Sequence, residues 1–155
     1  MDGDMEQLIE RLKAATGPDR EIDLAIKIAM DPAGDIADAT KHRRGLDGAE
    51  GYSWYIVRGS VILEKYTSDG RCPFNAGYQL PAYTASIDSA LTLVPDGLAW
   101  TLGQNVHHRY WLASVNNLDD EGSPQSIGYS GLKGDPTPAL ALCIAALKAR
   151  QSFTQ

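Results

Sequence analysis

The sequence predicts an α+β fold in which an antiparallel β-sheet packs against helices in a layered sandwich. Apolar residues recur at helical spacing near both ends of the chain and once in its middle. Two pairs of segments rich in β-branched and aromatic residues lie between them, and short turns within each pair favour antiparallel strands. With 155 residues, we expect one globular domain over 1–155.

The first half of the chain predicts two helices, two strands and two loops. Helices are expected over 5–15 and from about residue 19 to 30, where Asp31-Pro32 ends the second. Residues 33–51 contain four glycines and the basic run Lys41-His42-Arg43-Arg44, and are expected to form a loop. Strands follow over 52–57 and 60–66, and 67–80 is a second expected loop. Arg58-Gly59 forms either a hairpin turn or a bulge within one long strand.

The second half predicts a short helix, a hairpin, a long loop and a last helix. The short helix begins at Thr84 or Ser86, and Pro95-Asp96-Gly97 forms a turn after it. Strands are expected over 98–102 and 108–115. Residues 116–135 are polar, so we expect a long surface loop. Thr137 caps a helix that starts at Pro138 and continues to about residue 150.

The composition excludes several classes of partner. The net charge is −6 and the pI about 4.9, which argues against binding to genomic nucleic acid, because that requires a cationic surface. No apolar run is long enough to span a bilayer, and residues 1–20 lack a signal-peptide core, so we expect no membrane partner and a cytoplasmic location. Cys72 and Cys143 are expected to be reduced thiols.

The sequence contains no recognisable catalytic motif. It has no phosphate-binding loop, no dinucleotide fingerprint and no nucleophile elbow. Two distant cysteines cannot supply a zinc site, and we expect no cofactor. In an extended strand the adjacent His107 and His108 would point to opposite faces, so they could act together on one atom only if a turn intervened. We therefore expect a protein that is not an enzyme.

Aromatic and arginine residues are concentrated between residues 52 and 78. Aromatic faces stack on nucleobases, and arginines bind phosphates or stack over rings, so this combination suits a nucleotide pocket. Hydroxyls at a helix start and a cation at a turn also suit anion binding. Packing and helix capping are the alternative explanation for each of these residues. The predicted ligand-binding residues are Trp54, Arg58, Arg71, Tyr78, Thr84, Ser86, His108 and Arg109.

Two segments resemble a family of small phage proteins. They are Pro-Ala-Tyr-Thr-Ala-Ser-Ile-Asp-Ser-Ala-Leu-Thr-Leu-Val-Pro-Asp-Gly at 81–97 and Pro-Ala-Leu-Ala-Leu-Cys-Ile-Ala-Ala-Leu-Lys-Ala-Arg at 138–150, with weaker similarity at 15–30. They resemble the phage αβα-sandwich family of tailed phages and prophages. The resemblance implies helix, sheet and helix layers and a phage origin, but no catalytic residues. Residues 33–80 depart most from the family pattern, so we expect an elaborated insertion there.

Two functions follow as hypotheses. Phages use small non-enzymatic proteins to sequester nucleotide immune signals, so the first is a counter-defence protein that binds a small anionic ligand, such as a cyclic nucleotide or an NAD-derived signal. The alternative is an interaction module that binds and inhibits a host defence protein or a phage protein. In both cases we expect a homo-oligomer, because exposed sheet edges require a partner.

Overall fold

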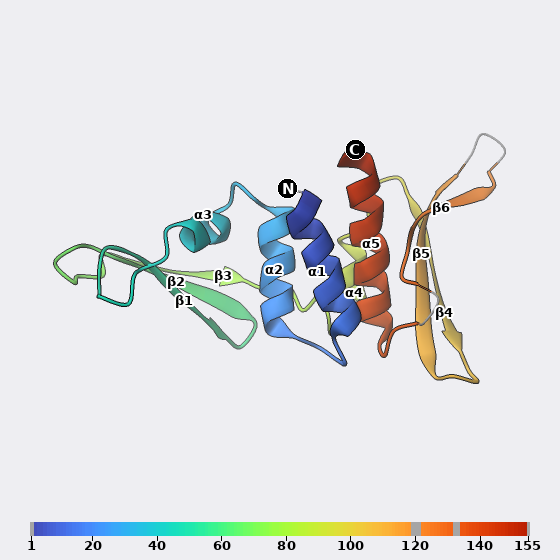
Figure 1. The fold of residues 1–155 in the computed structure, drawn as a ribbon, viewed down its shortest axis with the longest axis horizontal. Helices are drawn as coiled ribbons and strands as arrows, with labels where there is room; N and C mark the ends of the chain where they lie inside the picture. Colours follow the sequence, from blue (N-terminus) through green and yellow to red (C-terminus); the bar gives the residue numbers. More distant parts are fainter. Residues whose placement is uncertain (1, 119–121, 132–133, 155) are drawn as a thin grey trace. The chain divides into compact units, whose positions relative to one another are not determined.

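A computed structural model of the chain describes residues 2–118, 122–131 and 134–154 (Figure 1). It confirms the α+β class and the antiparallel pairing of the strands. The elements in chain order are α1 (Asp2–Ala14), α2 (Arg20–Met30), α3 (Asp35–Lys41), β1 (Gly51–Val57), β2 (Ser60–Tyr66), β3 (Phe74–Gln79), α4 (Ile87–Leu91), β4 (Ala99–Asn105), β5 (Tyr110–Leu118), β6 (Pro124–Tyr129) and α5 (Pro138–Thr154).

The chain divides into two compact units, where the sequence predicted one domain. Unit 1 consists of Met1–Ile22 and Ala82–Gln155, and unit 2 of Asp23–Pro81. Each unit has its own three-stranded sheet, with strand order β1-β2-β3 in unit 2 and β4-β5-β6 in unit 1. In each sheet, the three strands follow one another in the sequence and each strand pairs with its neighbour in the sequence. Among the described strands, no pairing joins one set of three to the other. The insertion predicted at 33–80 lies inside unit 2, which interrupts unit 1 in the sequence.

Helix α5 is the centre of unit 1. Every residue from Ala139 to Leu147 is buried, because α5 contacts β5 and β6 as well as α1 and α4. Figure 1 shows α5 between α1 and the β4-β5-β6 sheet. A helix that is apolar on all sides belongs in an interior. The Thr137 hydroxyl accepts a hydrogen bond from the Leu140 N–H at 3.2 Å, which confirms the predicted cap.

Residues 116–135 are not one long loop, as the sequence suggested. Asn116–Leu118 complete β5, and β6 occupies Pro124–Tyr129, with a bulge between Val115 and Asn116. The sequence did not predict β6 because its residues are mostly polar. An edge strand with a solvated face can form without alternating apolar residues. Residues 119–121 and 132–133, which belong to the same predicted loop, lie outside the described residues.

In unit 2, helices cover one face of the β1-β2-β3 sheet. Ile36 and Ala39 of α3 are buried against Val61 and Leu63 of β2, and Leu24 and Ile28 of α2 pack on the same cluster. Helix α3 contradicts the loop predicted at 33–51, and β3 contradicts the loop predicted at 67–80. Flanking glycines and prolines obscured both short elements.

A hairpin joins β1 to β2, which decides between the two arrangements that the sequence allowed. Val57 is paired with Ser60, so the loop consists of Arg58 and Gly59 alone. Both have positive φ, 45° and 83°, as a type I′ turn requires. Arg58 therefore lies at the tip of the hairpin.

The turn and cap predicted around the short helix of unit 1 are confirmed. Ser86, one of the two predicted caps of α4, accepts a hydrogen bond from the Ser89 N–H, and the Leu98 N–H bonds to the Pro95 carbonyl across the predicted turn. Cys72 and Cys143 are both free thiols. Within the described residues, no helix is long and apolar enough to cross a membrane.

Candidate anion-binding site in unit 2

The chain after α3 runs beside the outer edge of β1. Tyr52 donates its N–H to the His42 carbonyl at 2.9 Å and accepts from the Arg44 N–H at 2.7 Å. Gly51 allows this close approach, because a Cβ there would lie 2.8 Å from the His42 carbonyl oxygen and 2.9 Å from the Arg44 backbone. Its φ of 144° also disfavours any other residue. The pairing fixes Arg43 and Arg44 against the sheet edge.

Arg43 and Arg44 each stack on an aromatic ring of the sheet. The Arg43 guanidinium lies 5.1 Å from the centre of the Trp54 ring, and that of Arg44 lies 4.1 Å from the centre of the Tyr66 ring. Trp54 and Tyr66 point to opposite faces of the sheet, because strand side chains alternate and Trp54 pairs with Leu63. The Arg43 and Arg44 side chains therefore lie on opposite faces of the sheet, next to the edge of β1.

The two arginines differ in how far their donors are already used. Arg44 donates from Nε to the Ala49 carbonyl at 3.0 Å and from Nη2 to the Gly48 carbonyl at 2.9 Å. These bonds hold the turn that Gly45 and Gly48 close with a 3.2 Å backbone hydrogen bond. Arg43 is exposed and makes no such bond among the described residues. Arg44 therefore stabilises the turn that forms one wall of the site, and the guanidinium N–H donors of Arg43 are available for a ligand.

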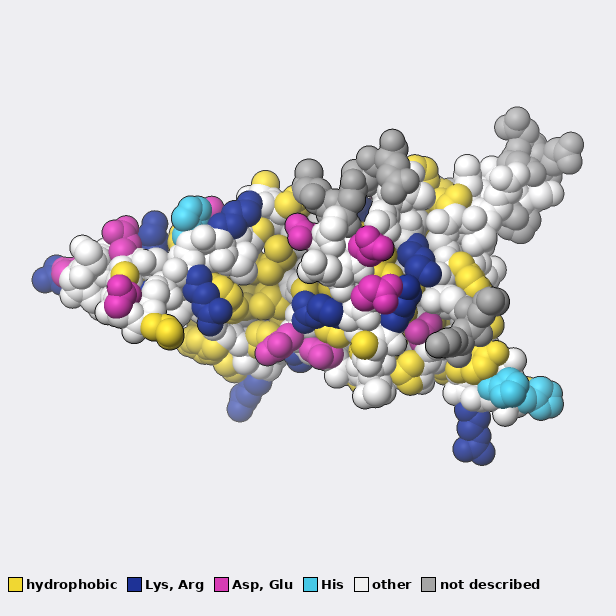
Figure 2. Space-filling model, viewed as in Figure 1, with side chains coloured by type: hydrophobic (Ala, Val, Ile, Leu, Met, Phe, Trp, Pro, Cys, Tyr) yellow, Lys and Arg dark blue, Asp and Glu magenta, His cyan; other side chains and the backbone are white. Residues whose placement is uncertain are grey.

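A pocket of about 350 Å³ opens between this turn and β1. Its wall combines two guanidinium groups, two aromatic rings and backbone groups of a glycine-containing turn, a mixture suited to holding a planar anion. The lining residues are Arg43, Arg44, Gly45, Leu46, Gly48, Tyr52, Ser53 and Trp54. Where α3 and β1–β3 lie, Figure 2 shows Lys and Arg side chains next to hydrophobic ones.

The cations around the pocket are not in direct ion pairs with described carboxylates. The Lys65 Nζ lies 5.4 Å from the centre of the Tyr52 ring, so three cations surround the aromatic rings. In the part of the chain that the structure describes, the basic groups within 4.0 Å of a carboxylate include Lys13, Lys27, His42 and Arg71, but not Arg43, Arg44 or Lys65. These three cations therefore form no direct ion pair in the described chain, although the Asp47 carboxylate lies in the same turn and accepts from the Ala49 N–H at 3.1 Å.

The pKa of Tyr66 is raised, first by its hydrogen bond to Glu64. The phenol donates to the Glu64 carboxylate at 2.9 Å, which favours the protonated form. The ring beneath the Arg44 guanidinium is therefore a neutral phenol.

Of the ligand-binding residues predicted in unit 2, the structure places Trp54 at the pocket and the other three elsewhere. Arg58 is exposed at the hairpin tip. The Arg71 Nε lies 3.2 Å from an Asp69 carboxylate oxygen, and its side chain is 85% exposed. Tyr78 donates to the Asp35 carboxylate at 2.6 Å, which raises the pKa of Tyr78.

The predicted residues of unit 1 have structural roles or lie at a turn. The buried Thr84 hydroxyl accepts from the Asp19 N–H at 2.8 Å, and Ser86 caps α4, which has only five residues. His108 and Arg109 lie in the exposed turn between β4 and β5, where the His108 ring stacks on Tyr110 with centroids 5.7 Å apart. These four residues surround no pocket that we identify in the described chain.

Sequence reasoning missed Arg43 and Arg44. They were part of the basic run noted in the 33–51 segment, but nothing local indicated that the chain returns to the edge of β1. The signal present in the sequence was Gly51 directly before a strand, since a glycine there permits a close backbone approach.

Replacing Gly51 with alanine is expected to open this site. The new Cβ would collide with backbone atoms of His42 and Arg44, so the 42–44 segment must leave the edge of β1. We expect the variant to lose about 1–3 kcal/mol of folding free energy. We also expect proteases to cleave the loop at 42–50 faster in the variant than in the native protein. Limited proteolysis followed by mass spectrometry of cleavage within 42–50 measures this, and equal cleavage rates would contradict the described packing.

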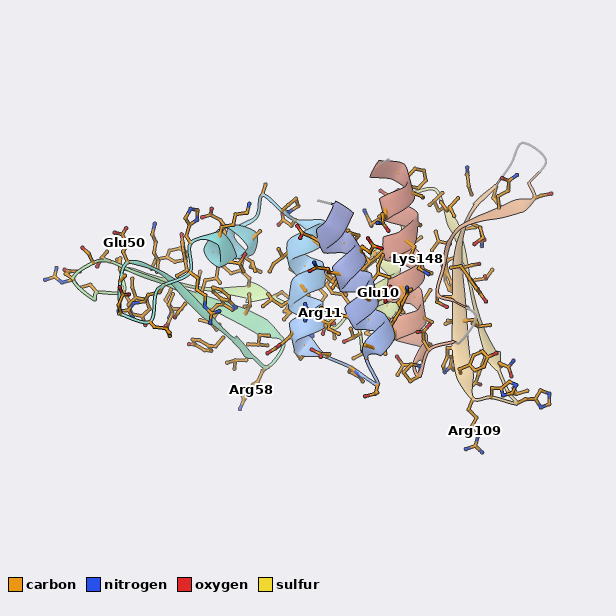
Figure 3. The ribbon with its side chains drawn as sticks, in the orientation of Figure 1. Glu10, Arg11, Glu50, Arg58, Arg109 and Lys148 are labelled. Atoms are coloured by element: carbon orange, nitrogen blue, oxygen red, sulfur yellow. The ribbon has the colours of Figure 1, made fainter. Side chains whose placement is uncertain are left out.

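Unit 1 contains a separate group of buried charges. The Asp135 side chain is buried, and its Oδ2 has no hydrogen-bond partner among the described residues. Burial raises the pKa of Asp135, against a lowering effect of its hydrogen bond to Ser130. Burial also lowers the pKa of Lys148, whose Nζ donates to the Tyr129 carbonyl at 2.6 Å. Figure 3 shows Lys148 on α5 and Glu10 on the neighbouring α1.

Asp135→Asn is expected to stabilise the protein at pH 7. Because the folded pKa of Asp135 lies above its ordinary value of 3.8, the folded state binds the proton more tightly than the unfolded chain does. The stability that the folded protein gains from a protonated Asp135 is fully present below pH 3.8 and is lost as the pH rises through the pKa of Asp135 in the folded state. Asparagine at position 135 does not ionise, so the variant does not lose this stability as the pH rises. Urea unfolding of both proteins from pH 3.5 to 8 should show a difference that grows with pH, and a constant difference would refute the assignment.

Comparison of the chain with protein-family models, with curated proteins and with solved structures found no match. The resemblance to the phage family therefore stays a prediction. Among the described residues, no group of three or more His, Cys, Asp or Glu side chains is placed to hold a metal ion.

Proposed function

We propose that this protein is a non-enzymatic binding protein whose unit 2 holds a small anion that carries a planar ring. The observation that carries the proposal is the pocket at the β1 edge, which Arg43, Arg44, Tyr52 and Trp54 line and where the Arg43 guanidinium stacks on Trp54 outside any ion pair of the described residues. In the proposed complex, Arg43 binds the anionic group, and the ligand ring lies against the aromatic wall.

A nucleotide-type molecule combines an anion and a planar ring in this way. The pocket volume of about 350 Å³ is near the lower end of the range of about 300–1,000 Å³ for small-molecule sites. This favours one nucleotide unit inside the pocket, with any remainder of a larger cyclic or NAD-derived ligand in solvent. In a phage, sequestration of such an immune signal would be a counter-defence function.

The test is a thermal-shift screen of the purified chain against mononucleotides, cyclic di- and trinucleotides and NAD-derived compounds. A ligand at about 100 times its dissociation constant adds roughly 2.7 kcal/mol to stability, which is a visible shift in Tm. We expect a selective shift that weakens as salt is added, because the anion is held by charge. A flat panel at millimolar ligand would reject the proposal.

The interaction module remains the second candidate. The observation that favours an interaction module is a set of large apolar side chains exposed on unit 2, two of which belong to β1. They are Leu46, Tyr55, Val57 and Phe74. Tyr55 and Val57 lie on the same face of β1, and neighbouring exposed apolar side chains are typical of protein-binding surfaces. A protein that does not shift with any nucleotide but binds a specific protein target would support this candidate over the first.

A further inference from the structure

The hairpin geometry determines which backbone groups of β1 face away from β2. A two-residue loop makes Val57 and Ser60 a hydrogen-bonded pair. Bonded pairs then alternate along the strand, so the N–H and C=O groups of Ile56, Trp54 and Tyr52 point outward. The bonds of Tyr52 to His42 and Arg44 agree with this alternation. β1 is also the outer strand of its sheet.

Beyond Tyr52 the edge of β1 is open. The chain that pairs with Tyr52 turns away at Gly45, and no backbone partner of Trp54 or Ile56 lies in the described part of the chain outside the β1–β2 pairing. Tyr55 and Val57 beside this edge are 47% and 43% exposed. Unpaired edge groups with exposed apolar neighbours form a template for an additional strand.

Arginines stand at both ends of this open edge. Arg43 and Arg44 lie beside its start, and Arg58 follows its last residue. Figure 3 shows the Arg58 side chain pointing away from the hairpin. None of the three is within 4.0 Å of a described carboxylate. An antiparallel second copy of β1 would bring Arg58 of each copy toward Arg43 and Arg44 of the other, so like charges oppose self-pairing.

We propose that the edge of β1 over Trp54–Val57 binds an extended acidic peptide segment as an added strand. The peptide backbone pairs with the outward N–H and C=O groups of Trp54 and Ile56. Its carboxylates reach the arginines at the two ends, and an apolar side chain of the peptide lies beside Tyr55 or Val57. This surface shares Arg43, Arg44 and Trp54 with the proposed small-anion pocket, and Arg58 and the outward backbone groups of Ile56 belong to the peptide surface alone.

The probe is a fluorescein-labelled decapeptide in which glutamate alternates with threonine and valine. Its control is the same peptide with lysine in place of glutamate. We expect the acidic peptide to bind in fluorescence anisotropy, more weakly as salt rises, and the lysine peptide not to bind. No binding of the acidic peptide, or equal binding of the two peptides, overturns the proposal.

Arg58→Asp reverses one end charge and retains the turn, because Asp-Gly is a preferred type I′ pair. We expect it to weaken binding of the acidic peptide roughly threefold to tenfold. The matched control is Arg109→Asp, at another hairpin turn with φ of 55°, and its affinity should equal that of the native chain. Equal losses in the two variants would show a non-specific charge effect and overturn the proposal.

N-methylation of the peptide tests strand pairing without changing the protein. Methyl groups on one set of alternate residues should abolish binding, because those N–H groups face β1, and methyl groups on the other set should leave it unchanged. Equal effects of both sets would exclude an added strand. A concentration-dependent dimer that Arg58→Asp strengthens would identify a second copy as the occupant and also overturn the proposal. Nucleotide binding by Arg58→Asp without peptide reports on the proposed function separately, because Arg58 does not line the pocket.

Discussion

Gly128→Ala is expected to unfold unit 1 under conditions in which the native protein is stable. A Cβ at Gly128 of β6 would lie 2.0 Å from the Ala145 carbonyl oxygen and 2.8 Å from the Ala149 nitrogen. Both are backbone atoms of α5, which is buried on all sides, so neither can move without repacking the core. We expect a cost of about 3 kcal/mol or more, at the upper end for overpacking.

Urea unfolding followed by circular dichroism measures this cost. Gly103→Ala in β4 is the matched control, because no atom lies within 4 Å of a Cβ at that position. The control should change stability by less than about 1 kcal/mol. If both variants unfold at the same urea concentration, β6 does not pack on α5 as described.

Arg43→Ala is expected to weaken binding of the anionic ligand about tenfold to a hundredfold. A hydrogen bond to a charged group contributes about 1.5–3 kcal/mol, and each 1.4 kcal/mol is a tenfold change in affinity. Because Arg43 is exposed, its removal should cost the fold little more than a cation–π contact of about 0.5–1 kcal/mol.

Arg71→Ala separates the structural assignment of the site from the one predicted from the sequence. Arg71 is an exposed arginine of the same unit, already paired with Asp69, so its removal should leave the affinity unchanged. Isothermal titration calorimetry of both variants, with the nucleotide that gives the largest thermal shift, measures the difference. Loss of binding in Arg71→Ala with none in Arg43→Ala would restore the sequence-based site.

Helices α1, α2, α4 and α5 and the β4–β5 hairpin were predictable because their signals are local. The cap at Thr137 depends on residues within three positions, whereas Arg58-Gly59 allowed a hairpin turn or a bulge, and the cap of α4 allowed Thr84 or Ser86, until the structure decided both. Helix α3 and strand β3 were missed because each is short and lies among glycines and prolines. The division into two sheets depends on which strands pair, and apolar spacing within a strand does not contain that information.

The site was predicted only in its chemistry. The sequence indicated that aromatic rings and arginines of the segment around 52–78 would combine, and Trp54 is at the pocket. It selected Arg58 and Arg71, which lie within that segment, whereas the pocket is lined by Arg43 and Arg44 from outside it. A backbone approach between the chain at 42–44 and Tyr52 brings Arg43 and Arg44 to the pocket, and such non-local pairing leaves only the indirect signal of Gly51.

The most direct test of the central claim is the response of the tryptophan indole N–H signals to the ligand in ¹H–¹⁵N NMR spectra. The three indoles belong to Trp54, Trp100 and Trp111, and Trp54→Phe assigns the first. The account predicts that a nucleotide shifts the Trp54 signal and leaves those of Trp100 and Trp111, both in unit 1, in place. A ligand that shifts only the latter two signals, or a saturated complex in which the Trp54 signal does not move, would contradict it.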